Sequence, residues 1–204
     1  MREHFEEALS FSVKRFVVSL FLLMAVSFTL WWAISAELVR PVILSANYIL
    51  EALLPYSFHE LKQQGADGLV FSTWGEVGGQ LVPARQAGHY LAFQFNTQIL
   101  SFSLPFFCAL TLAMPGAFQF GKLLFGIAIL YIVLLLGVVV LSIKTLMVGI
   151  GPAAFKEGMD TWFLNINVVG LFYQFNTLIL PVLVPVLLWA AQHRRILAGF
   201  INKP

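Results

Sequence analysis

Long apolar stretches alternate with short polar segments along this chain. The hydrocarbon core of a bilayer is about 30 Å thick, and a helix needs roughly 20 apolar residues to cross it. Four stretches approach or reach that length, at residues 16–38, 96–114, 123–143 and 171–191. The pattern therefore predicts an all-α membrane protein with four transmembrane helices, organised as one polytopic domain over residues 1–204.

The connection between the first two stretches has two parts. Residues 42–55 carry apolar side chains at helical spacing but are too few to span, so we expect them to lie along the outer interface. Residues 56–95 are polar and rich in glycine, with short β-type runs at 69–74, 79–85 and 90–95. This pattern predicts a small β-rich extracytoplasmic insert between helices 1 and 2.

The first apolar stretch has one competing interpretation. Lys14 and Arg15 precede it, as basic residues precede the apolar core of a signal peptide. The stretch is longer than such a core, and no small-residue cleavage motif follows it. An uncleaved transmembrane helix is therefore the favoured interpretation.

Composition agrees with the apolar pattern. Hydrophobic residues make up 59% of the chain and charged residues 11%, whereas soluble domains carry about 25% charged residues. The net charge of +2 gives no basic field that would favour nucleic acid as a partner. The lipid bilayer is the expected environment.

The basic residues predict an orientation. Cytoplasmic loops carry an excess of Lys and Arg, and placing both termini in the cytoplasm puts seven of the twelve basic residues inside: Arg2, Lys14, Arg15, Lys122, Arg194, Arg195 and Lys203. The other five lie outside: Arg40, Lys62, Arg85, Lys144 and Lys156. We expect both termini to be cytoplasmic and the insert to face out.

Two segments of the chain nearly repeat each other. Residues 93–100 read FQFNTQIL and residues 173–180 read YQFNTLIL, each followed by a proline, Pro105 and Pro185. In the predicted topology both segments lie where the chain enters the membrane from outside. Six polar residues form the candidate site for partner or client contacts: Gln94, Asn96, Thr97, Gln174, Asn176 and Thr177. The favoured explanation is capping of helix starts; the functional alternative is an outward-facing polar vestibule.

Few residues could carry chemistry. Cys108 is the one cysteine and lies in an apolar run with no base or cation nearby, so packing is favoured over a nucleophilic role. Glu37 and Arg40 are expected to pair at a helix end. The four histidines lack metal-ligand spacing, and no nucleotide or hydrolase motif is present. We expect no metal, no cofactor and no enzymatic activity.

Three segments of the chain resemble a known family. They are residues 15–73 apart from 43–48, then 93–115 (FQFNTQILSFSLPFFCALTLAMP), and 173–189 (YQFNTLILPVLVPVLLW). They are similar, in order, to the exosortase H-associated membrane proteins. This resemblance implies a bacterial inner-membrane protein that serves as an accessory in an exosortase-type envelope protein-sorting system, with the exosortase as a membrane partner. The family carries no established catalytic residues to transfer.

Three functional hypotheses follow. The first is a non-enzymatic accessory protein that packs against an exosortase or another membrane partner and presents its insert to a client. The second is a membrane subunit of another envelope biogenesis, secretion or conjugation complex. The third is a membrane enzyme whose outer-surface site uses His59, Glu60 or His89.

Overall fold

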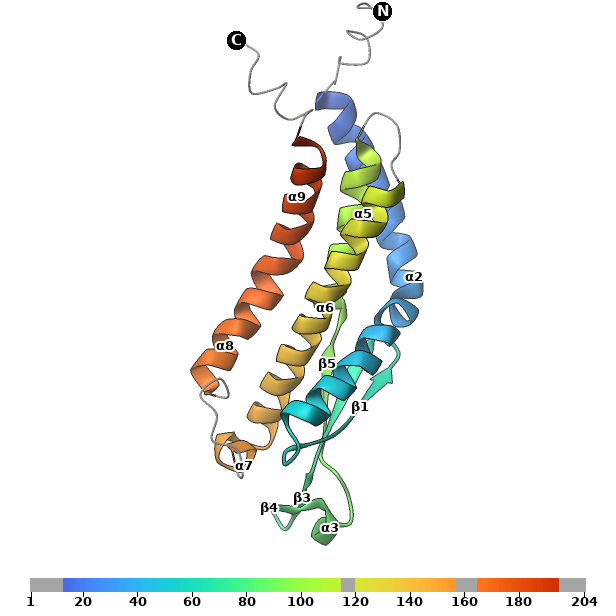
Figure 1. The fold of residues 1–204 in the computed structure, drawn as a ribbon. Coiled ribbons are helices and arrows are strands. Elements are labelled where there is room, and N and C mark those ends of the chain that lie inside the picture. The colour runs from blue at the N-terminus through green and yellow to red at the C-terminus, as the bar shows by residue number, and fades with distance from the viewer. Residues whose placement is uncertain (1–12, 115–119, 157–164, 195–204) are drawn as a thin grey trace, which may run out of the picture. The chain divides into compact units, whose positions relative to one another are not determined.

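The structure is a computed structural model that describes residues 13–114, 120–156 and 165–194 (Figure 1). Within these residues, three helical segments are long and apolar enough to cross a membrane. They are α2 (Val13–Leu53), α6 (Phe120–Gly149), and the run of α8 (Ile166–Gln174), the π-helix η2 (Phe175–Ile179) and α9 (Leu180–Gln192). The apolar windows predicted at 16–38, 123–143 and 171–191 lie inside them.

The predicted count of four transmembrane helices is not confirmed. The stretch expected at 96–114 forms a shorter apolar helix, Gln98–Ala113, in two pieces, α4 (Gln98–Ser101) and α5 (Ser103–Ala113). The N-terminal end of that stretch, up to Asn96, belongs instead to strand β5 (Ala92–Asn96). Asn96, the first residue of the predicted stretch, is the last residue of this strand, so the helix begins only at Gln98.

Helix α2 corrects a second prediction. We expected the first helix to end near residue 38 and residues 42–55 to form a separate interfacial segment. The structure has one helix of 41 residues with Pro41 inside it. A proline removes a backbone hydrogen bond and opposes an internal helical position. Here the helix continues because its second half buries an apolar face: Val39, Val42, Ile43, Ala46 and Leu50.

The described chain divides into two compact units. The first contains residues 13–34, 102–114, 120–130 and 182–194. In it, the fully buried ring of Phe107 lies directly over Gly126 of α6. Phe16 stacks on Trp189 with ring centroids 5.6 Å apart. These contacts join α5 to α6 and α2 to α9.

The second unit contains residues 35–101, 131–156 and 165–181. Its insert holds an antiparallel sheet in the order β1-β2-β5 and a separate β3–β4 hairpin. The strands are β1 (Phe58–Gln64), β2 (Asp67–Ser72), β3 (Trp74–Val77) and β4 (Gln80–Pro83), and a one-turn helix α3 (Ala84–Ala87) follows β4. The predicted β-rich insert is present, and β1 is a strand that the sequence pattern did not reveal.

Several contacts hold the sheet to the helices of this unit. Asn47 of α2 accepts a hydrogen bond from the backbone N–H of Leu61 at 2.8 Å, and Gln63 donates to the carbonyl of Ala36 at 2.6 Å. On α6, the ring of Phe93 lies against Gly149, so closely that a Cβ there would be 2.5 Å from the ring. The helix ends at this glycine.

The chain then forms a short helix, α7 (Pro152–Lys156), which also belongs to the second unit. Ser57, fully buried at the start of the insert, donates a hydrogen bond to the carbonyl of Phe155 at 2.9 Å. Phe155 is itself fully buried. This bond links the insert to the segment that follows α6.

Candidate functional site

The first copy of the repeated segment lies where β5 passes into α4. Gln94 and Asn96 are exposed strand residues, and Gln94 donates a hydrogen bond to Asp67 at 2.7 Å. Asn96 accepts one from the backbone N–H of Gln98 at 2.7 Å, the geometry of a capping residue at a helix start. Thr97 is fully buried, and its hydroxyl donates to the carbonyl of Ala66 in the β1–β2 turn. Capping therefore accounts for Asn96.

The second copy has a different backbone. Gln174 ends α8, and Asn176 and Thr177 lie inside the π-helix η2. Asn176 donates to the carbonyl of Phe172 at 2.9 Å, and Thr177 donates to the carbonyl of Tyr173 at 2.7 Å. The expectation that this copy caps a helix start is wrong, because the start of α8 is capped by Asn165, which accepts from the N–H of Asn167 at 2.9 Å.

The π-helix explains these side-chain bonds. A π-helix widens the turn to i→i+5 hydrogen bonds, as in the bond from the N–H of Leu180 to the carbonyl of Phe175. The wider turn disturbs the regular i→i+4 hydrogen bonds of the carbonyls just before it. Side chains four residues later in the chain can then donate to these carbonyls. Thr177 bonds the carbonyl of Tyr173, and Asn176 adds a second bond to the carbonyl of Phe172, which also accepts from the backbone N–H of Phe175. Short π-segments inside α-helices occur frequently at functional sites.

The two copies meet in the second unit, where α4 contacts η2. Thr97 and Ser101 are fully buried there, and Asn176 is 7% exposed. The carboxamide oxygen of Asn176 is buried and has no hydrogen-bond partner among the described residues. Gln94, Asn96 and Gln174 remain exposed. The predicted set therefore divides into a buried part and an exposed part, so it is not one uniform ring.

Further polar groups join this region from α2 and α6. Gln98 donates to the buried hydroxyl of Ser35 at 3.4 Å, and Tyr131 donates to the carbonyl of Leu38 at 3.1 Å. Lys144 lies 4.8 Å above the ring of Tyr173 as a cation–π pair. Sequence reasoning missed Ser35 and Tyr131, because a serine or tyrosine inside an apolar stretch gives no periodic signal.

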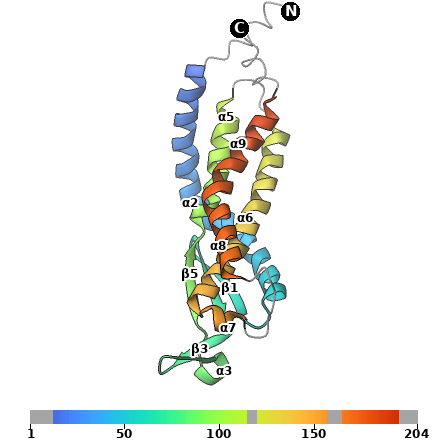
Figure 2. The same cartoon turned by 90° about the vertical axis from the view of Figure 1, so that its left-hand side faces the viewer.

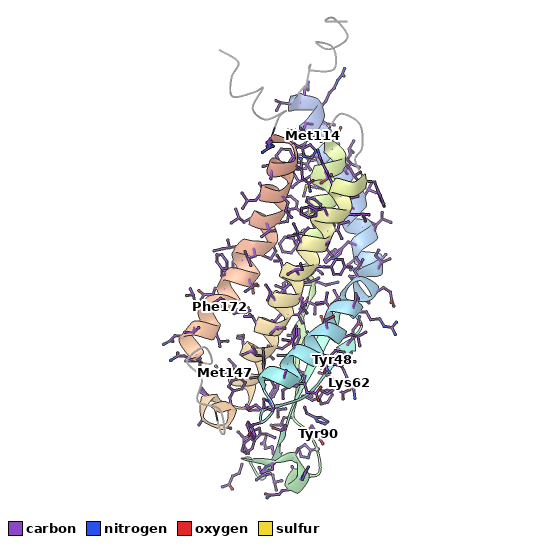
Figure 3. All side chains as sticks on the ribbon, viewed as in Figure 1. Tyr48, Lys62, Tyr90, Met114, Met147 and Phe172 are labelled. Atoms are coloured by element: carbon purple, nitrogen blue, oxygen red, sulfur yellow. The ribbon has the colours of Figure 1, made fainter. Side chains whose placement is uncertain are left out.

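The alternative site on the insert contains few ionisable groups. The rings of His59 and Tyr90 stack in parallel with centroids 3.9 Å apart, and Glu60 forms an ion pair with Lys62 at 2.9 Å. Tyr90 and Lys62 are labelled in Figure 3. His89 contacts the carbonyl of Ala87 through its ring nitrogen at 3.1 Å. Across the described part of the chain, no group of three or more His, Cys, Asp or Glu residues could hold a metal ion.

The sequence analysis also singled out the Glu37–Arg40 pair and Cys108. Arg40 and Glu37 form the expected exposed ion pair, 3.6 Å apart, but they lie inside α2 and not at a helix end, because this helix continues to Leu53. Cys108 is a free, half-buried cysteine in α5. Its neighbour Phe107 packs in the core of the first unit.

Comparison with known proteins identifies the family. The sequence model of the exosortase H-associated membrane proteins matches residues 10–196, which is most of the chain. The chain therefore belongs to this family of membrane proteins, as the resemblance of its three segments indicated. No match was found among curated proteins or among solved structures.

Proposed function

We propose that this member of the exosortase H-associated membrane protein family is a non-enzymatic accessory subunit. It packs against a membrane-embedded exosortase in the bacterial inner membrane and holds its insert beside a client protein. The family match supports the association with an exosortase. The accessory role is supported by the chemistry described above, because the buried polar groups bond mainly to backbone carbonyls.

The proposal depends on the half of α2 that contains the apolar stretch 16–38. None of the 18-residue apolar window of this helix is buried inside the chain, whereas a third of the α6 window is. One exposed stripe of this half consists of small residues four apart, Ala25, Thr29 and Ala33. Small residues at this spacing let two membrane helices approach closely. This stripe is the proposed contact with the exosortase.

Co-purification tests the contact. The chain and its exosortase are co-expressed, and the complex is isolated in mild detergent through a tag on this chain. The double substitution Ala25→Leu and Ala33→Leu should reduce recovery of the exosortase at least about tenfold, because a larger side chain prevents close helix approach. Leu112→Phe, on an exposed position of α5, is the matched control and should leave recovery unchanged. Recovery of the wild-type chain only as a partnerless monomer would contradict the proposal.

The proposed topology places both termini in the cytoplasm. This requires the short helix Gln98–Ala113 to cross together with the three long segments. Its length of roughly 24 Å is slightly less than the hydrocarbon core, a mismatch that local thinning of the bilayer can absorb. Reporter fusions at the two ends test the topology. Termini found on opposite sides of the membrane would show that only three segments cross.

A further inference from the structure

The sheet of the insert has two edges that differ. Its strand order leaves β1 at one edge and β5 at the other (Figure 2). An edge strand carries a row of backbone N–H and C=O groups that can pair with another chain, and proteins usually block such edges. The blocking features of the two edges can be compared directly.

The β1 edge is blocked. Its outward N–H at Leu61 is bonded to the side chain of Asn47 on α2. The pairing of β1 with β2 is irregular between Phe58 and Glu60. An edge bulge, charged residues and a covering helix all oppose the addition of another strand.

The β5 edge is open. The backbone bond from Ser72 to Leu91, at 2.8 Å, sets the alternation of the antiparallel ladder. Residues 93 and 95 therefore direct their backbone groups to β2, and residues 92, 94 and 96 direct theirs outward. Leu91 accepts from Ser72, and its N–H donates to the carbonyl of Trp74. Ala92, Gln94 and Asn96 are all exposed, and none of their outward backbone groups is bonded within the described residues. β5 contains no proline, no charged residue and no bulge.

We propose that β5 binds an extended segment of another polypeptide by strand addition, through the backbone groups of Ala92, Gln94 and Asn96. This inference rests on the proposed function only in taking the insert as the client-facing part of the chain. Main-chain bonds supply affinity in this mode of recognition, and alternating side chains supply specificity. A five-residue strand offers outward bonding groups at every second position.

The flanking side chains define the kind of segment that fits. On one face of the sheet, Gln94 at the edge donates a hydrogen bond to Asp67, so the edge is polar on this face. The other face carries Phe93 and Phe95, whose rings lie against Gly149 of α6 and Gly68 of β2 and make this face apolar. The added strand should therefore alternate polar and apolar residues. Because β5 leads directly into the apolar helix Gln98–Ala113, the segment should lie next to a membrane anchor of its own.

A second copy of this chain does not fit the edge. The segment from β5 to α4 runs antiparallel to α6, since Phe93 lies against Gly149 and Leu100 lies against Gly137. α6 is long and apolar enough to cross a membrane, so two copies that insert in the same direction would present parallel β5 strands. In a parallel pair of strands, a residue that points toward the partner strand does not bond to the residue directly opposite it. It bonds to the two residues on either side of that opposite residue. A two-fold axis would place residue 94 of one copy opposite residue 94 of the other. Its bonding partners would then be residues 93 and 95 of the other copy, but these direct their backbone groups to their own β2, so the bonds cannot form.

Peptide binding to the purified full-length chain in detergent tests the inference. The probe is a fluorescein-labelled heptapeptide of alternating threonine and valine, measured by fluorescence anisotropy. A second probe has the same sequence with alternate backbone nitrogens methylated, which removes the donors of one edge. The unmodified peptide should bind and the methylated peptide should not. A peptide that does not bind, or two peptides that bind equally, would overturn the proposal.

Two variants locate the binding. Gln94→Pro removes one outward N–H and leaves the ladder to β2 intact, so the affinity should fall about tenfold, the effect of losing one hydrogen bond. Gln94→Thr changes the side chain but keeps the N–H and should bind nearly as the wild type does. Equal affinity of the two variants would place the peptide elsewhere. Co-purification of the exosortase is measured separately. If the peptide does not bind but the exosortase still co-purifies, strand addition is rejected and the proposed accessory function stands.

Discussion

The close packing of α5 on α6 decides whether a larger side chain at Gly126 stabilises or destabilises the protein. Gly126 faces the ring of Phe107, and a Cβ placed on Gly126 would lie 2.1 Å from the ring carbon Cζ. Ordinary contacts begin near 3.4 Å. Phe107 is fully buried, so its ring has no free space into which it could swing. Gly126→Ala therefore forces either the ring or the helix to move.

Two opposing terms determine the size of the effect. Replacing a helical glycine by alanine stabilises a helix by about 1 kcal/mol. Overpacking of a filled core destabilises by about 1–3 kcal/mol. The net effect of Gly126→Ala should be a loss of up to about 2 kcal/mol, or a fall of about 4–8 °C in melting temperature. Gly121, on the same helix, has open space around it, so Gly121→Ala should raise the melting temperature by about 2–4 °C.

The single cysteine provides the assay. Cys108 lies next to Phe107 in α5 and is half-buried, so a dye that becomes fluorescent on reacting with thiols reports the loosening of this packing as temperature rises. Phe107→Leu combined with Gly126→Ala should recover part of the lost stability, because the smaller side chain makes room for the new methyl group. If Gly126→Ala stabilised the protein as much as Gly121→Ala does, the close approach of ring and glycine would be refuted.

Two further substitutions test hydrogen bonds in the second unit. Asn47→Leu removes the acceptor for the N–H of Leu61 and should destabilise the protein by about 1–3 kcal/mol. Deuterium exchange of the Leu61 amide should become faster in this variant. The outward amide of Gln94 should exchange rapidly even in the wild type. Asn176→Leu removes a buried oxygen that has no partner among the described residues, but it also loses the amide bond to the carbonyl of Phe172. These effects oppose each other, so the substitution should be neutral or stabilising by about 1 kcal/mol. Thr177→Val loses a bond and relieves no unpaired group, so it should destabilise by about 1 kcal/mol. Thermal melting measures both, and a large destabilisation by Asn176→Leu would mean that its oxygen is bonded after all.

The apolar pattern predicted the helices well where length alone decides. Residues 123–143 contain no charge and no proline, and α6 covers them completely. The pattern failed where packing outweighs local preference. We expected the first helix to end near residue 38, so that Pro41 would lie outside it. It lies inside α2 because the residues around it bury an apolar face in the second unit.

The missed strand β1 has a physical explanation. Its residues, FHELKQQ, do not alternate between buried and exposed, and buried positions fall at Phe58 and Leu61. That spacing of three is closer to a helical period than to a strand period. The irregular pairing between Phe58 and Glu60 shifts the side chains and produces this spacing. A local sequence pattern cannot reveal such a shift, because it depends on the partner strand.

The repeated segments show how far a motif alone can predict a site. In the first copy, Gln94, Phe95 and Asn96 end strand β5; in the second, Gln174 ends α8, and Phe175, Asn176 and Thr177 lie in the π-helix η2. The first copy can be a strand because β2 lies beside it and supplies partners for its backbone. The second has no neighbouring strand among the described residues, so its backbone groups must be satisfied within the helix. In both copies the asparagine and threonine bond to backbone groups where regular hydrogen bonding is interrupted. The sequence could reveal this shared chemistry, whereas the two backbones depend on which neighbours the fold supplies.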